Sequence, residues 1–125
     1  MRRARGFTLI ELLMVVVIIG ILVSVLIPRW SSTRERAFLA SMKSDLRNLL
    51  VAEETYYGDN VTYTTSLSSI QYAMSQGVTV TITGATGSGW SATAGHTATS
   101  RTCGIFYGTA TPPMAGQNEG EPRCN

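Results

Sequence analysis

Charged residues and potential metal ligands are scarce in this chain of 125 residues. Asp, Glu, Lys and Arg together make up 14% of it, and the formal net charge of +2 is too small to indicate a nucleic-acid partner. His96 is the only histidine, and no second ligand accompanies it, so we predict a solvent-facing strand residue rather than a metal site. The sequence contains no Ser-His-Asp or Cys-His pairing, phosphate-binding loop or zinc spacing. We therefore expect no enzymatic activity, no catalytic residues, and no bound cofactor or metal.

Cysteine is almost as rare as histidine. Cys103 and Cys124 are the only two, and neither belongs to a C-x-x-C redox or zinc motif. We therefore predict one disulfide between them, closing a loop of about 20 residues and contributing about 3 kcal/mol in the chain-entropy model. Such a bond requires an oxidising compartment, such as the periplasm or the cell exterior.

One long run contains almost no charge. Residues 7–27 read FTLIELLMVVVIIGILVSVLI, with Glu11 as the single charged side chain. As a helix this run would be about 31 Å long, which matches a hydrocarbon core of about 30 Å. A secretory signal carries an A-x-A-like cleavage site after its apolar core, and none is found here, so we expect the run to be retained as a membrane span. Arginines lie on both sides of it and leave its orientation undecided.

A second helical pattern follows this run. Residues 31–57 predict an amphipathic helix, because apolar residues recur at helical spacing with charged residues between them. The apolar set is Leu39, Met42, Leu46, Leu49 and Leu50, and the charged set is Lys43, Asp45, Arg47 and Glu53. Pro28 separates two helical patterns, so we expect it to kink one helix of about 50 residues rather than end it. Gly58, Asp59 and Asn60 supply the stop signal.

The rest of the chain predicts a small sheet. Residues 78–83 and 90–95 alternate between apolar and small polar residues and flank a Gly-rich turn, which favours a hairpin; residues 103–107 predict a third strand. We expect a loop with one short turn over residues 61–76, and a Pro- and Gly-rich loop after Gly108. The resulting fold class is α+β: a long kinked N-terminal helix packed on an antiparallel sheet of three or four strands, with a C-terminal disulfide loop. Residues 58–125 contain few large apolar side chains, so they should need the helix and the disulfide for stability.

The residues around Gly6 carry a family resemblance. RGFTLIELL resembles the processing site of type IV prepilins and pseudopilins. This resemblance implies that an inner-membrane prepilin peptidase cuts between Gly6 and Phe7 and then N-methylates Phe7. It also implies four parts: a leader (1–6), a transmembrane and filament-core helix (7–30), an amphipathic helix (31–57) and a globular β head (58–125). Without the leader, seven basic and eight acidic side chains remain, for a net charge of −1.

Glu11 has two possible roles in the sequence. Thr8 and Glu11 form a T-x-x-E capping box, and a carboxylate in a first helical turn also suits the helix dipole. The resemblance implies instead that Thr8 and Glu11 belong to the assembly site, where Glu11 pairs with the Phe7 amine of a neighbouring subunit. Gly20 and Pro28 are similarly ambiguous, because both are tolerated in membrane helices, yet they occupy the positions of the helix-breaking pair of pilins.

Charges on the two ends of the amphipathic helix differ in sign. Arg29, Arg34 and Arg36 lie near the expected membrane surface, whereas Glu53, Glu54 and Asp59 lie at the far end. A solvated surface explains this pattern. Alternatively, staggered subunits bring the basic patch of one chain to the acidic end of another.

The resemblance implies a structural subunit of a type IV pilus, held in the inner membrane with a periplasmic C-terminal region and extracellular after assembly. Its expected partners are other copies in a helical filament, the prepilin peptidase and methyltransferase, and the inner-membrane assembly machinery. Adhesion, twitching motility or DNA uptake follow from the resemblance alone. Alternatives are a minor pilin or a type II secretion pseudopilin. The major secretion pseudopilins carry a calcium-binding C-terminal loop, for which Glu119 and Glu121 are too few acids. A membrane-tethered monomeric binding module is an alternative of another class.

Overall fold

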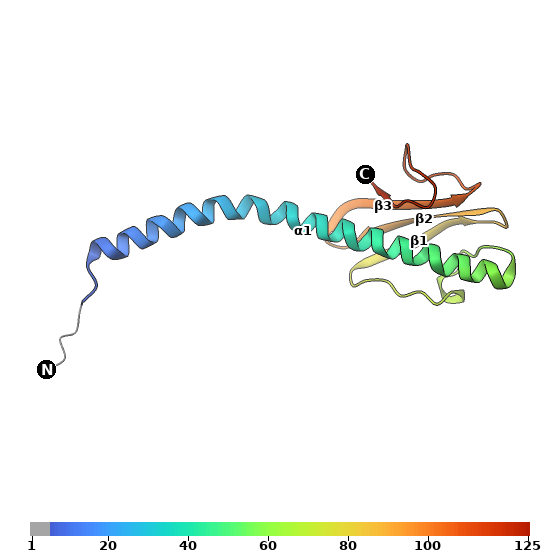
Figure 1. Ribbon diagram of the computed structural model, residues 1–125, viewed down its shortest axis with the longest axis horizontal. Coiled ribbons are helices and arrows are strands. Elements are labelled where there is room, and N and C mark those ends of the chain that lie inside the picture. The colour runs from blue at the N-terminus through green and yellow to red at the C-terminus, as the bar shows by residue number, and fades with distance from the viewer. Residues whose placement is uncertain (1–5) are drawn as a thin grey trace. The chain divides into compact units, whose positions relative to one another are not determined.

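The computed structural model describes residues 6–125, apart from the side chains of Pro28 and Arg29. Its elements, in chain order, are α1 (Leu9–Asn60), η1 (Leu67–Ser69), β1 (Val78–Ala85), β2 (Gly89–His96), β3 (Thr99–Gly108) and β4 (Arg123–Cys124) (Figure 1). The chain divides into two compact units, Met1–Arg34 and Glu35–Asn125. We call them the N-terminal unit and the C-terminal unit and describe each by itself.

α1 is one helix of 52 residues, which confirms the expectation of a single helix of about 50. Its backbone is helical through Pro28, although proline has no N–H to donate to the carbonyl four residues earlier. The kink expected at Pro28 stays a prediction. The leader arginines Arg2, Arg3 and Arg5 lie outside the described residues.

α1 ends just before a residue whose side chain is unfavourable for the backbone conformation that it adopts. The expected stop at residues 58–60 is confirmed, but Gly58 is still helical and the left-handed position falls on Val61, with φ of 55°. The Val61 N–H donates to the Tyr57 carbonyl at 2.8 Å, which is the bond of a left-handed C-terminal cap. A β-branched residue is strained in this conformation. Val61 is also 72% exposed, so no burial of its side chain offsets the strain.

The sheet has four antiparallel strands in the order β1-β2-β3-β4. The expected hairpin is confirmed: β1 and β2 pair from Val78 opposite His96 to Ala85 opposite Trp90. Between them, the Thr86 N–H donates to the Gly89 carbonyl at 2.9 Å. The alternation of β1 is also confirmed, because its valines and isoleucine are buried and the threonines between them are exposed.

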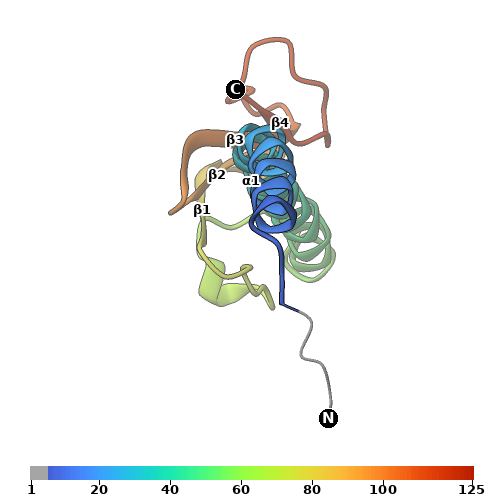
Figure 2. The ribbon, with the colours of Figure 1, turned by 90° about the vertical axis from the view of Figure 1, so that its left-hand side faces the viewer.

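The core of the C-terminal unit lies between α1 and one face of this sheet (Figures 1 and 2). Its largest fully buried apolar side chains come from both layers: Met42, Leu46 and Leu49 of α1, Trp90 of β2 and Ile105 of β3. The apolar positions expected for the amphipathic helix are therefore the ones that cover the sheet. Neither layer could exclude water from its apolar face without the other.

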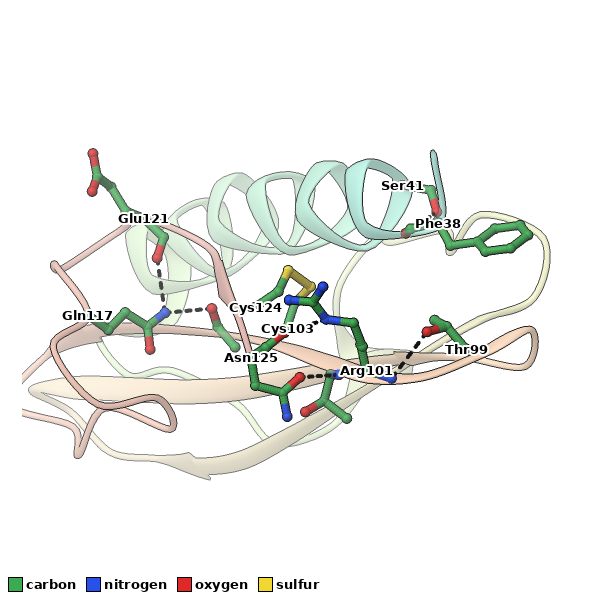
Figure 3. Close-up of a disulfide and its surroundings, with 11 residues drawn as sticks. Phe38, Ser41, Thr99, Arg101, Cys103, Gln117, Glu121, Cys124 and Asn125 are labelled. Atoms are coloured by element: carbon green, nitrogen blue, oxygen red, sulfur yellow. Dashed lines mark hydrogen bonds between the residues drawn. A yellow bond between two sulfur atoms is a disulfide. The ribbon is translucent and has the colours of Figure 1, made fainter. Parts of the chain in front are cut away.

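The expected disulfide joins β3 to β4. Cys103 and Cys124 lie opposite each other in the strand register and are bonded (Figure 3). β4 has only two residues and was not expected as a strand; the disulfide and two hydrogen bonds between Thr102 and Asn125, at 3.0 and 3.1 Å, hold it in place. The loop before β4 packs closely on β3, since a Cβ on Gly104 would lie 2.5 Å from Pro113.

Replacing Val61 by glycine should stabilise the C-terminal unit. Left-handed backbone costs a residue with a Cβ about 1 to 2 kcal/mol, and glycine removes this cost. Glycine also loses more conformational entropy on folding, which offsets about 0.5 to 1 kcal/mol of the gain. We expect Val61→Gly to raise the free energy of unfolding by about 0.5 to 1 kcal/mol, measured by urea denaturation in detergent. Val51→Gly, at an exposed position inside α1, is the matched control and should lower stability by a few tenths of a kcal/mol. A loss of stability in both variants would contradict the assignment of strain to Val61.

Removing the disulfide should weaken the same unit. A Cys103→Ala, Cys124→Ala double variant is expected to lose about 2 to 5 kcal/mol of unfolding free energy. Thermal unfolding followed by circular dichroism with and without reductant measures this loss. Reductant should lower the midpoint of the wild-type chain and leave that of the double variant unchanged.

Candidate assembly site

Gly6, Phe7 and Thr8 lie immediately before α1 and are accessible to solvent. Phe7 is 80% exposed. A Cβ placed on Gly6 would meet no atom of the chain within 4 Å. The folding of this chain therefore does not require glycine at position 6, and a requirement for it would have to come from another molecule.

Thr8 and Glu11 form the expected capping box. The Thr8 N–H donates to Glu11 Oε2 at 2.9 Å, the Thr8 hydroxyl donates to the same oxygen at 2.7 Å, and the Glu11 N–H donates to the Thr8 hydroxyl at 3.3 Å. These bonds satisfy backbone donors that no helical carbonyl can reach. Among the described residues, both hydrogen bonds to the Glu11 carboxylate end on Oε2, so Oε1 can accept a further donor. The capping and pairing roles of Glu11 therefore do not exclude each other.

The first part of α1 is apolar on every side. From Leu9 to Ile27 its large apolar side chains are 44 to 82% exposed. By length and composition α1 contains one segment that could cross a membrane, and none of that segment is buried within the protein. A helix that is apolar all round must be covered by lipid or by other helices. Gly20 lies within this segment, and a Cβ there would also meet open space.

Two carboxylates of α1 lie where the sequence did not predict them. Asp45 and Glu53 were assigned to the charged residues between the apolar positions, but Asp45 is 2% exposed and Glu53 is fully buried. Both face the connection between α1 and β1, residues 61–77, which we call the connecting segment. The Ser75 N–H and hydroxyl each donate to Asp45 at 2.8 Å, and the Thr64 N–H donates to Glu53 at 3.1 Å. These partners lie 11 to 30 residues further along the chain, in a stretch whose sequence has no periodic pattern.

The helical spacing of Asp45 and Glu53 is the one feature of the sequence that indicates their burial. Asp45 and Glu53 follow Met42 and Leu49 by three and four positions, so they belong to the same helical face as the core. Burial raises the pKa of the Glu53 carboxyl, and the negative charge of Glu54 adds to the effect. Burial together with the carboxylate of Asp45 raises the pKa of Tyr72, whose hydroxyl donates to the Asp45 carbonyl at 3.0 Å.

The acidic end of α1 is therefore smaller than the sequence predicted. Glu53 faces the core, which leaves Glu54 and Asp59 exposed. Glu54 also accepts a hydrogen bond from the Tyr63 hydroxyl at 2.9 Å. Burial raises the pKa of Tyr63, and this bond adds to the rise. An intersubunit role for Glu53 through contact with arginines is excluded as long as the C-terminal unit keeps this fold.

The expectation of a strand residue at His96 is confirmed, since His96 ends β2, but the residue is only partly solvent-facing. Its ring is half-buried and stacks on the ring of Phe38 in α1, with centroids 4.3 Å apart. Its Nδ1 accepts a hydrogen bond from the Ala98 N–H at 3.0 Å. In residues 6–125 no group of three or more His, Cys, Asp or Glu side chains could hold a metal ion. Glu119 and Glu121 instead accept hydrogen bonds from Gly108 and Asn118, at 2.7 and 2.9 Å.

These features define a class of protein: an α+β fold with a disulfide and an apolar N-terminal helix, whose first turn contains a carboxylate that takes part in a capping box. The prokaryotic N-terminal methylation motif matches residues 1–27. The chain is 35% identical over 116 residues to the type IV wide pilus major component PilA4 of Thermus thermophilus, covering 90% of this chain and 85% of that protein. The chain belongs to the family of type IV pilins and pilin-like proteins.

Two further relatives match a shorter region. The type II secretion system core protein G of Klebsiella pneumoniae is 39% identical over 75 residues, which is 60% of this chain and 54% of that protein. The type IV major pilin protein PilA of Myxococcus xanthus is 36% identical over 75 residues, which is 60% of this chain and 34% of that protein. Of these three matches, the one to PilA4 covers the largest share of both chains.

Proposed function

We propose that this chain is the structural subunit of a type IV pilus, without enzymatic activity. It is stored in the inner membrane through residues 7–27 and polymerises through α1. The observation that carries this proposal is the apolar surface of residues 9–27, which the chain itself leaves exposed on every side. Lipid tails cover this surface before assembly and neighbouring helices cover it afterwards. Lipid and leucine are about equally apolar, so packing and polar contacts must favour the filament.

The proposed orientation places the N-terminus in the cytoplasm and the C-terminal unit in the periplasm, and then on the outside of the cell. The Cys103–Cys124 disulfide supports a periplasmic C-terminal unit, because such bonds persist in oxidising compartments.

A pseudopilin of type II secretion is the second candidate, favoured by the similarity to protein G over 75 residues. The longer match to PilA4 favours the pilin. Electron microscopy of sheared surface fibres, with mass spectrometry of their main protein, separates the two. This chain is expected as the main protein of the fibres; its absence from them, together with a secretion defect on deletion, would indicate the pseudopilin.

We further propose that the prepilin peptidase cuts between Gly6 and Phe7, and that the new amine of Phe7 is methylated. The exposure of residues 6–8 supports access by a protease. Gly6 has no neighbour that would exclude a side chain, so the need for glycine is assigned to the peptidase, which requires close approach to the backbone.

Gly6→Val should therefore leave the chain folded and membrane-inserted but uncleaved. Intact mass of the membrane-extracted chain measures this outcome, since the variant should retain residues 1–6 and the unmethylated Phe7. Gly20→Ala is the matched control, because Gly20 also has open space around it, and it should be cleaved normally. Normal cleavage of Gly6→Val would refute the assigned site, and a wild-type chain that keeps Met1 would indicate the membrane-tethered module.

Assembly is proposed to depend on Glu11 and on the amine that cleavage creates at Phe7. An α-amino group ordinarily has a pKa of about 7.7 to 8.0 and is largely protonated at neutral pH. The Phe7 amine of a neighbouring subunit can bind Glu11 Oε1 while Oε2 keeps both bonds from Thr8. The pairing neutralises a carboxylate within an apolar environment, where an unpaired charge is costly.

Glu11→Gln should prevent filament formation without preventing processing. Glutamine can still accept the Thr8 hydrogen bonds but has no charge for the amine, and loss of one partner of a buried ion pair costs about 3 to 5 kcal/mol. We expect cleaved, methylated chain in the membrane and no sheared fibres. Thr8→Val weakens the capping box and leaves the charge, so it should still assemble. Normal fibres from Glu11→Gln would show that the pairing is not required.

A further inference from the structure

The connecting segment is fastened to α1 at two places that differ in how completely their hydrogen bonds are satisfied. At Asp45, one carboxylate oxygen accepts the Ser75 N–H and the other accepts the Ser75 hydroxyl, both at 2.8 Å. At Glu53, Oε2 accepts the Thr64 N–H at 3.1 Å, whereas Oε1 is buried and has no hydrogen-bond partner among the described residues. A buried charged oxygen without a donor is unfavourable. The Glu53 attachment is therefore the weaker of the two.

The Glu53 attachment also holds an aromatic cluster. Tyr63, which precedes Thr64, is buried; its ring stacks on Tyr57 at 4.6 Å between centroids and lies edge-on to Tyr107 at 6.3 Å. The Tyr63 N–H donates to the Thr86 carbonyl, in the turn between β1 and β2, at 3.2 Å. Release of Thr64 from Glu53 would therefore loosen Tyr63 from both α1 and the sheet.

Burial is the largest effect on the Glu53 carboxyl and favours its neutral form, whereas the hydrogen bond from the Thr64 N–H favours the charged form and is the smaller effect. Among the described residues, the charge that acts on Glu53 is the carboxylate of Glu54, which has the same sign. The other titratable groups packed at this attachment are the phenols of Tyr57, Tyr63 and Tyr107. The indole Nε1 of Trp90, in β2, is also buried without a hydrogen-bond partner among residues 6–125. Among residues 6–125, no cation is found to act on the Glu53 carboxyl and compensate for its ionisation while Thr64 is hydrogen-bonded to it.

We propose that ionisation of Glu53 releases residues 61–66 from α1, so that this part of the connecting segment is closed at acidic pH and opens more often as pH rises. In the open form water can hydrate both carboxylate oxygens, which favours the charged state. The raised pKa of buried Glu53 agrees with this direction. In the open form the carboxyl has the ordinary pKa of glutamate, about 4.3 to 4.5. Because its pKa is higher in the closed form, the neutral carboxyl stabilises closure at pH values below this ordinary pKa. That contribution is lost as the pH rises through the pKa of the closed form. The Asp45 attachment has both oxygens paired, so release stays local and exposes the Tyr57, Tyr63 and Tyr107 cluster.

Amide hydrogen exchange in the full-length chain, in detergent micelles from pH 4 to pH 8, tests this proposal. After correction for the intrinsic exchange rate, the opening constants of the Tyr63 and Thr64 amides should rise across this range, by a factor of ten for each unit that separates the carboxyl pKa of the closed form from that of the open form. Glu53→Gln, which cannot ionise, should abolish this dependence. Asp45→Asn is the matched control at the other attachment and should increase exchange at Ser75 while leaving the pH dependence at Thr64 intact.

Two results would overturn the proposal. One is corrected exchange at Thr64 that does not change with pH in the wild-type chain. The other is a pH dependence in Glu53→Gln equal to that of the wild type. If Glu53→Gln does not fold, Glu53→Met replaces it, because methionine fills a similar volume without an ionisable group and the same two outcomes apply. The measurement does not require filaments, so it is independent of the proposed pilus function.

Discussion

The apolar surface of residues 9–27 is the constraint on which the biology of this chain depends. A segment that is apolar in all directions has no face that water can solvate, so the chain must keep it in lipid or against other protein at every stage. The polar features of the N-terminus fit this requirement. The capping box satisfies backbone donors at the start of α1, where neither lipid nor a preceding helical turn can do so. The single carboxylate is also the one group in this segment that can distinguish a charged partner from lipid.

α1 has a second duty in the C-terminal unit. From Glu35 onward it supplies one of the two layers of the core, because Met42, Leu46 and Leu49 cover the apolar face of a sheet that has few large side chains of its own. The same helix therefore forms half of a hydrophobic core at one end, and at the other end it has the apolar surface of the proposed membrane and filament segment. We therefore expect substitutions on the sheet-facing side of residues 39–50 to change folding, and those within residues 9–27 to change the contacts made with other molecules.

The sequence predicted what depends on local pattern. The long helix, the β1-β2 hairpin, the capping box and the Cys103–Cys124 bond all followed from periodicity, turn residues or a count of two cysteines. What was missed depends on partners distant in the chain. Asp45 and Glu53 were taken for solvated charges because their partners Ser75 and Thr64 lie in a segment without periodicity. His96 was taken for a solvent-facing residue because the sequence does not show that Phe38 lies against its ring. β4 is two residues long and pairs because the disulfide and Asn125 hold it in place.

Glu11 and Glu53 show how similar chemistry leads to different roles. Each is a carboxylate in apolar surroundings with Oε2 hydrogen-bonded within the chain and Oε1 without a donor among the described residues. Glu11 is exposed on the N-terminal unit, so its free oxygen can be satisfied by a donor from another subunit. Glu53 is enclosed in the C-terminal unit, where a second subunit cannot reach it while the fold is closed. Its free oxygen can be satisfied by a proton, or by water once residues 61–66 have moved. In the roles proposed here, the location of the unsatisfied oxygen, outside or inside the fold, decides whether the carboxylate contributes to assembly or to a change within one subunit.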